Sequence, residues 1–371
     1  MTRKPSNKRV LLSLLTAGAC AALAGEAQAT LILYDDFNYT VGDRLGGSGT
    51  SPVGQVAPNG QTWITRSPAL AGSYNPVNDT QITAGNLSYA GLATSSGNSI
   101  RYGSSVASGA TNLYTDAIAL PSAVTSGSLY YSMIVRFNGA VAPGGVRHNY
   151  ASLSTESANV GTDAGLGLGT SSGTSNIPMP AGAWMRDSGT TDFHLGSGKA
   201  NSDGMGPSAS APSWQSIAAG HPFPNQQGNT GGTGQDKATI AADGPFFVVL
   251  KYTYNGASAA DDTVSMWINP IASSLGDNAG ELVAGGAAGS YYSATNAFVT
   301  AALDASTIQS FVLLGRGQAS AANVNKSIDT SLDELRIGTT WADVTPAVPE
   351  PASMAALSLL GAGMTMRRRK R

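Results

Sequence analysis

The chain has 371 residues, of which 42% are hydrophobic and only 12% are charged, and it contains 46 glycines. Exposed helix surfaces are normally rich in Glu, Lys and Arg, so this composition argues against a protein built mainly from helices. Omitting residues 1–29 and 347–371 leaves 12 basic and 21 acidic residues, and this net charge of −9 argues against nucleic acid or anionic lipid surfaces as partners.

The amino end has the three parts of a secretory signal peptide. A cationic opening is followed by an apolar run from Val10 to about Ala24 and by the small-residue triplet Ala27-Gln28-Ala29, which predicts cleavage before Thr30. The apolar run is shorter than the roughly 20 residues that a spanning helix needs. A retained membrane anchor is therefore the weaker alternative.

Cys20 is the single cysteine of the chain and lies inside this signal. The preceding Ala17-Gly18-Ala19 loosely resembles a lipoprotein cleavage site, although Ala17 replaces the usual branched aliphatic residue. Lipidation at Cys20 is thus a minor alternative. The mature chain is expected to have no disulfide, no thiolate metal site and no cysteine nucleophile.

Several segments alternate with period two between apolar and polar side chains. In residues 129–139, Tyr131 and Met133 share one face while Tyr130 and Arg136 share the other, and residues 246–256 and 263–270 behave alike. Segments of this kind, separated by turn-rich spacers, predict an all-β protein: a two-sheet antiparallel β-sandwich, or jelly roll, with long Gly/Ser-rich loops.

Residues 171–243 are rich in Gly, Ser, Pro and Asn, which fits either a linker between two domains or long loops within one. Because DFHLGSG at 192–198 has the pattern of a strand, we expect one domain over residues 30–346. Asn201 to Lys237 is then an insertion.

Three blocks carry a resemblance to a known family. They are LILYDDFNYTVGDRLGG at 31–47, FFVVLKYTYNGASAADDTVSMWINP at 246–270 and SLDELRIGTTWADVTP at 331–346. Together they resemble exported concanavalin A/laminin-G-like jelly rolls. The resemblance implies a sandwich whose first and last strands lie side by side, but it implies no activity, because the fold serves lectins, adhesins and polysaccharide-active enzymes alike.

Two candidate sites follow from this arrangement. If the polar face of the strand at 263–268 is open, Trp267, Asn269, Tyr130 and Arg136 would form a glycan-binding surface, with an aromatic plane and polar neighbours. The alternative is a tryptophan packed beneath a loop.

The second candidate is acidic. If the terminal strands pair, Asp35, Asp36, Asp333 and Glu334 could hold a structural Ca²⁺, or these acids could simply face water. No other cofactor is indicated.

Catalysis is not predicted. Between the two end segments the only glutamates are Glu156, Glu281 and Glu334, widely separated, and no alternating carboxylate pair of the kind that glycosidases use stands in a predicted strand.

The carboxyl end combines Val348-Pro349-Glu350-Pro351, an uncharged apolar stretch over 352–366 that predicts a short hydrophobic helix, and a basic cluster. That cluster consists of Arg367, Arg368, Arg369, Lys370 and Arg371. Positive charge beside an apolar segment stays in the cytoplasm, so this tail would halt export with the domain outside. Because the apolar stretch is short for a permanent span, its insertion in the inner membrane would be transient. An ordinary carboxyl-terminal anchor is the alternative.

This order of features resembles the PEP-CTERM sorting signal, here residues 347–371. The resemblance implies an exosortase-type transpeptidase as partner and delivery to the surface or extracellular matrix of a Gram-negative bacterium that makes exopolysaccharide. The expected function is a non-catalytic glycan-binding or adhesive module. A purely structural matrix component and, third, a polysaccharide-active hydrolase or lyase are the alternatives.

Overall fold

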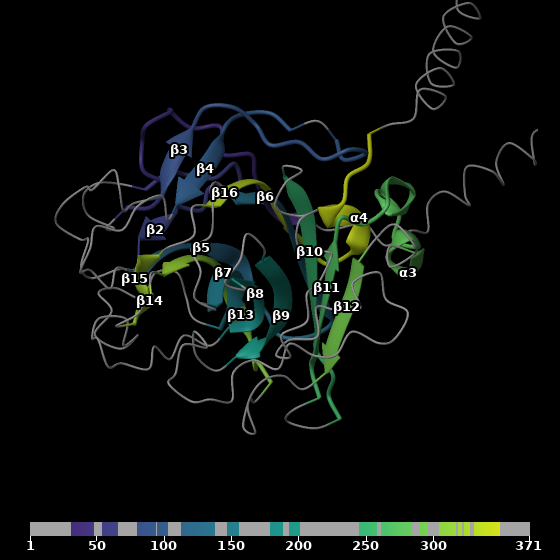
Figure 1. Ribbon diagram of the computed structural model, residues 1–371. Coiled ribbons are helices and arrows are strands. Elements are labelled where there is room, and N and C mark those ends of the chain that lie inside the picture. The colour runs from purple at the N-terminus through teal and green to yellow at the C-terminus, as the bar shows by residue number, and fades with distance from the viewer. Residues whose placement is uncertain are drawn as a thin grey trace, which may run out of the picture.

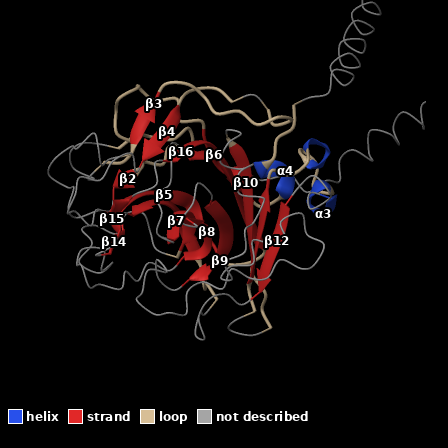
Figure 2. Ribbon diagram, viewed as in Figure 1, coloured by secondary structure: helices blue, strands red, loops and turns tan. Residues whose placement is uncertain are grey.

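The computed structural model describes residues 31–47, 54–65, 80–93, 95–102, 113–137, 147–155, 179–187, 193–200, 245–257, 261–283, 290–295, 304–316, 318–320, 323–326 and 330–348. Strands dominate these residues, and the short helices lie together at one side of the molecule (Figure 1; Figure 2). The signal peptide over 1–29 and the tail from 349 onward lie outside the described residues.

The strands form two main antiparallel sheets. The eight-stranded sheet has the order β12 (Ser290–Thr295), β11 (Thr263–Ile268), β10 (Phe246–Thr253), β6 (Ser128–Phe137), β16 (Thr330–Gly338), β4 (Ser99–Tyr102) and β3 (Gln81–Thr83), with β1 (Leu31–Asp35) also paired to β16. The six-stranded sheet has the order β2 (Ile64–Thr65), β5 (Leu113–Val124), β13 (Ile308–Arg316), β7 (Arg147–Ser154), β8 (Met179–Asp187) and β9 (Phe193–Ala200). A separate pair joins β14 (Gln318–Ser320) to β15 (Asn323–Lys326).

The expected β-sandwich is confirmed, as is the pairing of its first and last strands. β1 runs antiparallel to β16, with Leu31 opposite Gly338 and Asp35 opposite Leu335. The strand predicted at 192–198 is β9, but β8 was missed inside the glycine-rich region. Both strands belong to the six-stranded sheet, since β8 pairs with β7 and with β9.

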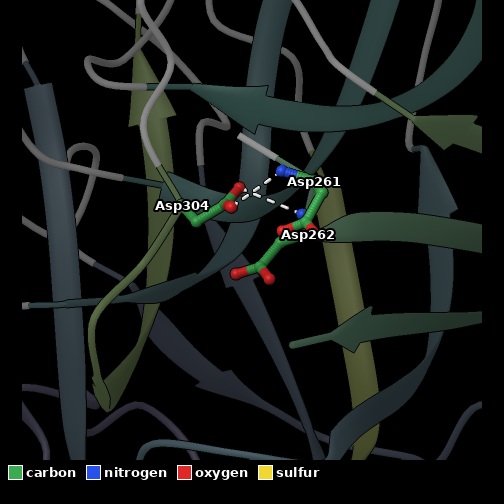
Figure 3. A group of neighbouring side chains, drawn as sticks. All are labelled: Asp261, Asp262 and Asp304. Atoms are coloured by element: carbon green, nitrogen blue, oxygen red, sulfur yellow. Dashed lines mark hydrogen bonds between the residues drawn. The ribbon is translucent and has the colours of Figure 1, made fainter. Parts of the chain in front are cut away.

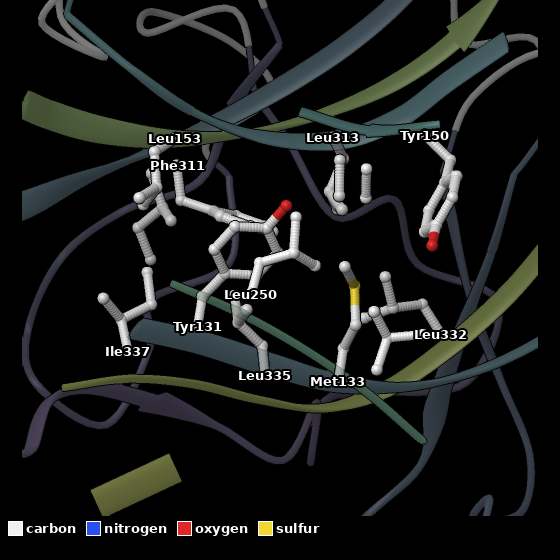
Figure 4. Packing of buried hydrophobic residues seen from close by; sticks show 14 of the residues in the cluster. Tyr131, Met133, Tyr150, Leu153, Leu250, Phe311, Leu313, Leu332, Leu335 and Ile337 are labelled. Atoms are coloured by element: carbon white, nitrogen blue, oxygen red, sulfur yellow. The ribbon is translucent and has the colours of Figure 1, made fainter. Parts of the chain in front are cut away.

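The main core lies between the two sheets and follows the period of two. Tyr131, Met133 and Leu250 point from the eight-stranded sheet toward Phe311 and Leu153 of the other (Figure 4). The ring centroids of Tyr131 and Phe311 are 5.3 Å apart in an edge-to-face arrangement. Burial of these alternate side chains is the driving force that holds the two sheets together.

A second hydrophobic cluster covers the other face of the eight-stranded sheet, which we call the outer face. Phe247 and Val249 of β10 and Ile134 of β6 point there, although a wetter face was expected. This part of the outer face is apolar because short helical elements cover it. These are η2 (Ala272–Ser274), α3 (Gly280–Val283) and α4 (Trp341–Val344). Antiparallel strands buried on both faces need apolar residues on both faces.

The chain after β16 is tied back to the sandwich as far as Val348. Helix α4 begins with a capping box in which Thr340 and Asp343 each bond the other's backbone N–H. Beyond it, the Ala93 N–H donates to Pro346 O over 2.7 Å, and the Val348 N–H donates to Gly91 O over 3.1 Å. The described part of the sandwich therefore runs directly up to the Pro-Glu-Pro segment.

No helix among the described residues is both long and apolar enough to cross a bilayer. The apolar stretch at 352–366 lies outside the described residues.

Candidate functional site

The predicted sugar platform at Trp267 is wrong, because its indole is buried. Trp267 is only 2% exposed and lies in the second cluster on the outer face. Its ring meets that of Trp341 edge to face, with centroids 5.1 Å apart, and Trp341 donates its indole N–H to Ser274 O over 2.6 Å. A ring covered in this way has no free face on which a sugar could stack.

Two other members of that predicted surface have structural contacts as well. The Asn269 side-chain oxygen accepts the Phe247 N–H over 2.9 Å, so this residue ties the end of β11 to β10. Tyr130 is 4% exposed and donates to Glu281 Oε2 over 2.6 Å. Asn269 is partly exposed, whereas Arg136 is exposed and lines a pocket.

This pocket, which we call the arginine pocket, has a volume of about 260 Å³. It lies on the outer face of the eight-stranded sheet, beyond the second cluster. Its lining residues are Thr83, Ala84, Gly85, Asn86, Leu87, Ser99, Arg101, Arg136 and Ser331. Arg101 and Ser331 were not among the predicted site residues, although both lie on the polar side of their strands.

The floor of the pocket is a row of three residues on three adjacent strands. Ser331 of β16 pairs directly with Arg101 of β4 on one side and with Arg136 of β6 on the other. Directly paired residues point to the same face of a sheet. Their chain neighbours Ile100 and Leu332 belong to the main core, which places the row on the outer face.

The wall of the pocket is the segment 84–87, and Asp333 anchors it. The Leu87 N–H donates to Asp333 Oδ2 over 2.8 Å, while the Glu334 N–H donates to Asp333 Oδ1, also over 2.8 Å. Ser95 adds a hydrogen bond to Leu87 O over 2.6 Å. Asp333 therefore holds a loop in place beside the two arginines.

The four acids predicted to bind calcium do not assemble into a metal site within the described residues. The Asp35 carboxylate accepts hydrogen bonds from Trp63 Nε1 and Tyr39 Oη, both over 2.7 Å, and from the Phe37 N–H over 2.8 Å. Glu334 accepts from Tyr34 Oη over 3.1 Å and from Arg336 over 2.8 Å. The strands pair as expected, but the carboxylates serve separate protein donors.

Asp36, the fourth of these acids, is part of the loop surface. It accepts from the Asn38 N–H over 3.3 Å and from the Ser96 hydroxyl over 3.0 Å. Burial is the main cause of the raised pKa of Asp333, and the charge of Asp36 adds a small further rise.

Burial and charge change the acidity of two of these groups. Burial raises the pKa of Asp333 to about 8, against the lowering effect of its two N–H donors, and the nearby Glu334 and Asp36 charges add to the rise. Burial likewise raises the pKa of Asp35 to about 6, although its three donors act in the opposite direction.

These shifts predict a loss of stability with rising pH. An unfolded aspartate titrates near 3.8, so between about pH 4 and pH 8 the folded state binds more protons at Asp333 than the unfolded state does. Stability at that group is therefore highest below pH 4 and falls until the pH passes 8. Thermal melting at pH 5 and pH 9 should show a smaller drop in Asp333→Asn than in the unchanged protein. An equal drop in both proteins would contradict the assignment.

The structure also brings together three aspartates that were not predicted from the sequence to form a site. One carboxylate oxygen each from Asp261, Asp262 and Asp304 lies within 4.8 Å of the others (Figure 3). The carboxylate of Asp304 accepts the N–H groups of Asp261 and Asp262, over 2.8 and 3.1 Å. Asp262 in turn accepts from Tyr252 Oη and from the Asn255 N–H. Oxygen atoms so arranged could hold a hard cation. The hydrogen bonds to Asp304 and Asp262 also fix the turn between β10 and β11.

Comparison with known proteins settles the identity of the tail. Residues 347–370 match the PEP-CTERM protein-sorting motif. The chain carries a PEP-CTERM sorting signal. Such a signal marks an exported protein that is anchored transiently in the membrane and processed by an exosortase. The PEP-CTERM match begins at Ala347, which pairs with Leu92 of the sandwich in an isolated bridge.

Solved structures with a similar backbone fold include enzymes and carbohydrate-binding proteins. Alginate lyase Aly36B is 13% identical, with a TM-score of 0.41, over 82% of this chain and 95% of that chain. The marine PL-14 alginate lyase from Aplysia kurodai is 14% identical, with a TM-score of 0.35, over 69% and 86% of the two chains. The Emp47p carbohydrate recognition domain is 10% identical, with a TM-score of 0.33, over 82% and 96%. Likeness at this level transfers neither an activity nor a ligand. No curated protein matches the chain.

Proposed function

We propose that this protein is a non-catalytic module that an exosortase delivers to the surface or extracellular matrix of a Gram-negative bacterium, where it binds exopolysaccharide. The observation that carries the proposal is the PEP-CTERM signal directly after the β-sandwich. The signal peptide predicted over 1–29 supports export from the other end of the chain.

The boundary between sandwich and signal favours this role. Val348 still bonds to Gly91, and the Pro-Glu-Pro segment follows at once. Removal of the tail within or after that segment would leave β16, α4 and their contacts intact. A processed protein of this kind keeps its whole described fold outside the cell.

The contacts of the described glutamates favour binding over hydrolysis. Glu281 forms an ion pair with Lys251 over 2.8 Å and accepts from Tyr130, while Glu334 pairs with Arg336. A glycosidase needs two carboxylates facing one scissile bond, one as acid and one as base or nucleophile. These two glutamates are instead engaged with separate protein partners.

Sorting and binding are tested separately. In the producing organism, Pro349→Ala combined with Glu350→Ala should leave the tail attached and the protein in the membrane fraction, whereas the unchanged protein should be shorter by mass spectrometry. Identical masses and locations for both proteins would contradict processing at this signal.

Binding is measured with the purified full chain and exopolysaccharide from the same organism, by equilibrium titration. Saturable binding without release of new sugar ends supports the proposal. Absence of binding would favour a purely structural matrix component. Release of reducing or unsaturated ends would identify a hydrolase or a lyase instead.

A further inference from the structure

The arginine pocket concentrates positive charge on an acidic protein. Residues 30–346 hold only 12 basic residues against 21 acidic ones, yet Arg101 and Arg136 line the same pocket. Among the described residues that line it, none is an acid. A polyanion approaching this protein would be repelled by the net charge, so any favourable contact must come from a local positive site.

The two arginines are placed on the same face and at a regular spacing. Both pair with Ser331, and neighbouring strands are about 4.8 Å apart, so the two Cα atoms are roughly 10 Å apart. Both residues are exposed. Two long side chains at this spacing can reach one anionic group from opposite sides.

Two of the remaining lining residues suit the rest of a sugar ring. Asn86 is exposed and carries an amide that also donates to Ser95 O over 3.0 Å, and the partly exposed Thr83 carries a hydroxyl that lies 3.0 Å from the hydroxyl of the buried Ser99. Hydroxyls and amides both donate and accept, as sugar hydroxyls do. The pocket of about 260 Å³ is below the range of about 300–1,000 Å³ that is typical of drug-sized ligands, so it would take one small polar unit.

We propose that the arginine pocket binds the carboxylate of an acidic sugar unit in a polysaccharide, with Arg101 and Arg136 as the recognition residues. The guanidinium group presents a planar fork of N–H donors that matches a carboxylate in a bidentate way, which an ammonium group does not. Ser331 lies between the two arginines in the order of the strands. This inference rests on the proposed glycan-binding function and names the class of glycan.

The test compares two ligands that differ only in the acidic group: oligogalacturonate and the neutral α-1,4-linked galacto-oligosaccharide of the same length. Titration uses the full chain in non-ionic detergent. We expect saturable binding of the uronate alone, weakened by added salt because exposed charges are screened. Arg101→Gln and Arg136→Gln should each weaken binding about tenfold or more, and both Lys variants should recover only part of it.

The matched control is Lys251→Gln, which removes one positive charge elsewhere on the same sheet, where Lys251 pairs with Glu281. It should bind the uronate as the unchanged protein does. Equal melting temperatures of the two Gln variants and the unchanged protein show that binding, not folding, is affected. If a Gln variant has a lower melting temperature, the binding of the Lys variant at the same position is compared with that of the unchanged protein instead.

The outcomes separate this inference from the proposed function. Binding of exopolysaccharide that survives in the Arg101→Gln/Arg136→Gln double variant, or equal binding of both oligosaccharides, overturns the acidic-sugar pocket and leaves the proposed function standing. Displacement of the uronate by an equal concentration of inorganic phosphate also overturns it, since the site would then hold any anion. Failure of the unchanged protein to bind exopolysaccharide overturns the proposed function, while uronate binding that depends on both arginines would still support the pocket.

Discussion

Trp267→Ala is expected to lower the free energy of unfolding by about 3–5 kcal/mol, the cost of emptying a large aromatic site in a core. The indole is buried between β11 and the cover of the outer face, and it contacts Trp341 edge to face. Chemical denaturation followed by circular dichroism measures the change. Because the second cluster holds α4 against the sheet, we expect the Trp341 fluorescence to report the loss as well.

Leu282→Ala is the control for this substitution, since Leu282 is 89% exposed in α3 on the same face. Its effect should stay within about 0.5 kcal/mol. Equal stability of Trp267→Ala and the unchanged protein, together with lost glycan binding, would restore Trp267 as a binding residue and contradict the burial described above.

Asp35→Ala should destabilise the protein by a similar amount, about 3–5 kcal/mol, through the loss of hydrogen bonds rather than of volume. Its carboxylate serves Trp63, Tyr39 and Phe37, and both Asp35 and Trp63 are fully buried. Each donor left without an acceptor in the interior costs about 1–3 kcal/mol. Denaturant titration at pH 7 measures the loss.

Asp36→Ala is the neighbouring control. The hydrogen bonds that the Asp36 carboxylate accepts from described residues, the Asn38 N–H and the Ser96 hydroxyl, are exposed, and water can replace them. We expect a change of less than about 1 kcal/mol. A calcium-dependent increase in melting temperature that both aspartate variants abolish would contradict the separate roles described here and restore the predicted metal site.

The alternation of side chains along the strands was sufficient to predict the main core. Tyr131 and Met133 point between the sheets and Tyr130 points away, as their positions in the sequence require. Alternation also placed Trp267 and Arg136 on the outer face. It could not predict which part of that face is covered, because the cover comes from η2, α3 and α4, whose own contacts are long-range.

The candidate site shows the same limit. Arg136 was predicted, but its partner Arg101 lies in a strand of four residues whose pairing with β16 depends on strand order. Asp333 was predicted as a metal ligand from its nearness to the first strand. Its actual donors include the Leu87 N–H, which is 246 residues away in the sequence.

The sequence by itself determined the sorting signal and the faces of the strands, because both are local: the signal is a linear order of Pro-Glu-Pro, apolar stretch and basic cluster, and strand faces follow a period of two. Only the tertiary structure decided that Trp267 is buried, that the carboxylates of Asp35 and Glu334 have separate donors, and that Arg101 lies across Ser331 from Arg136. These facts depend on which strands become neighbours and which loops cover them. Strand order and loop cover are properties of the whole packed chain, which no short segment contains.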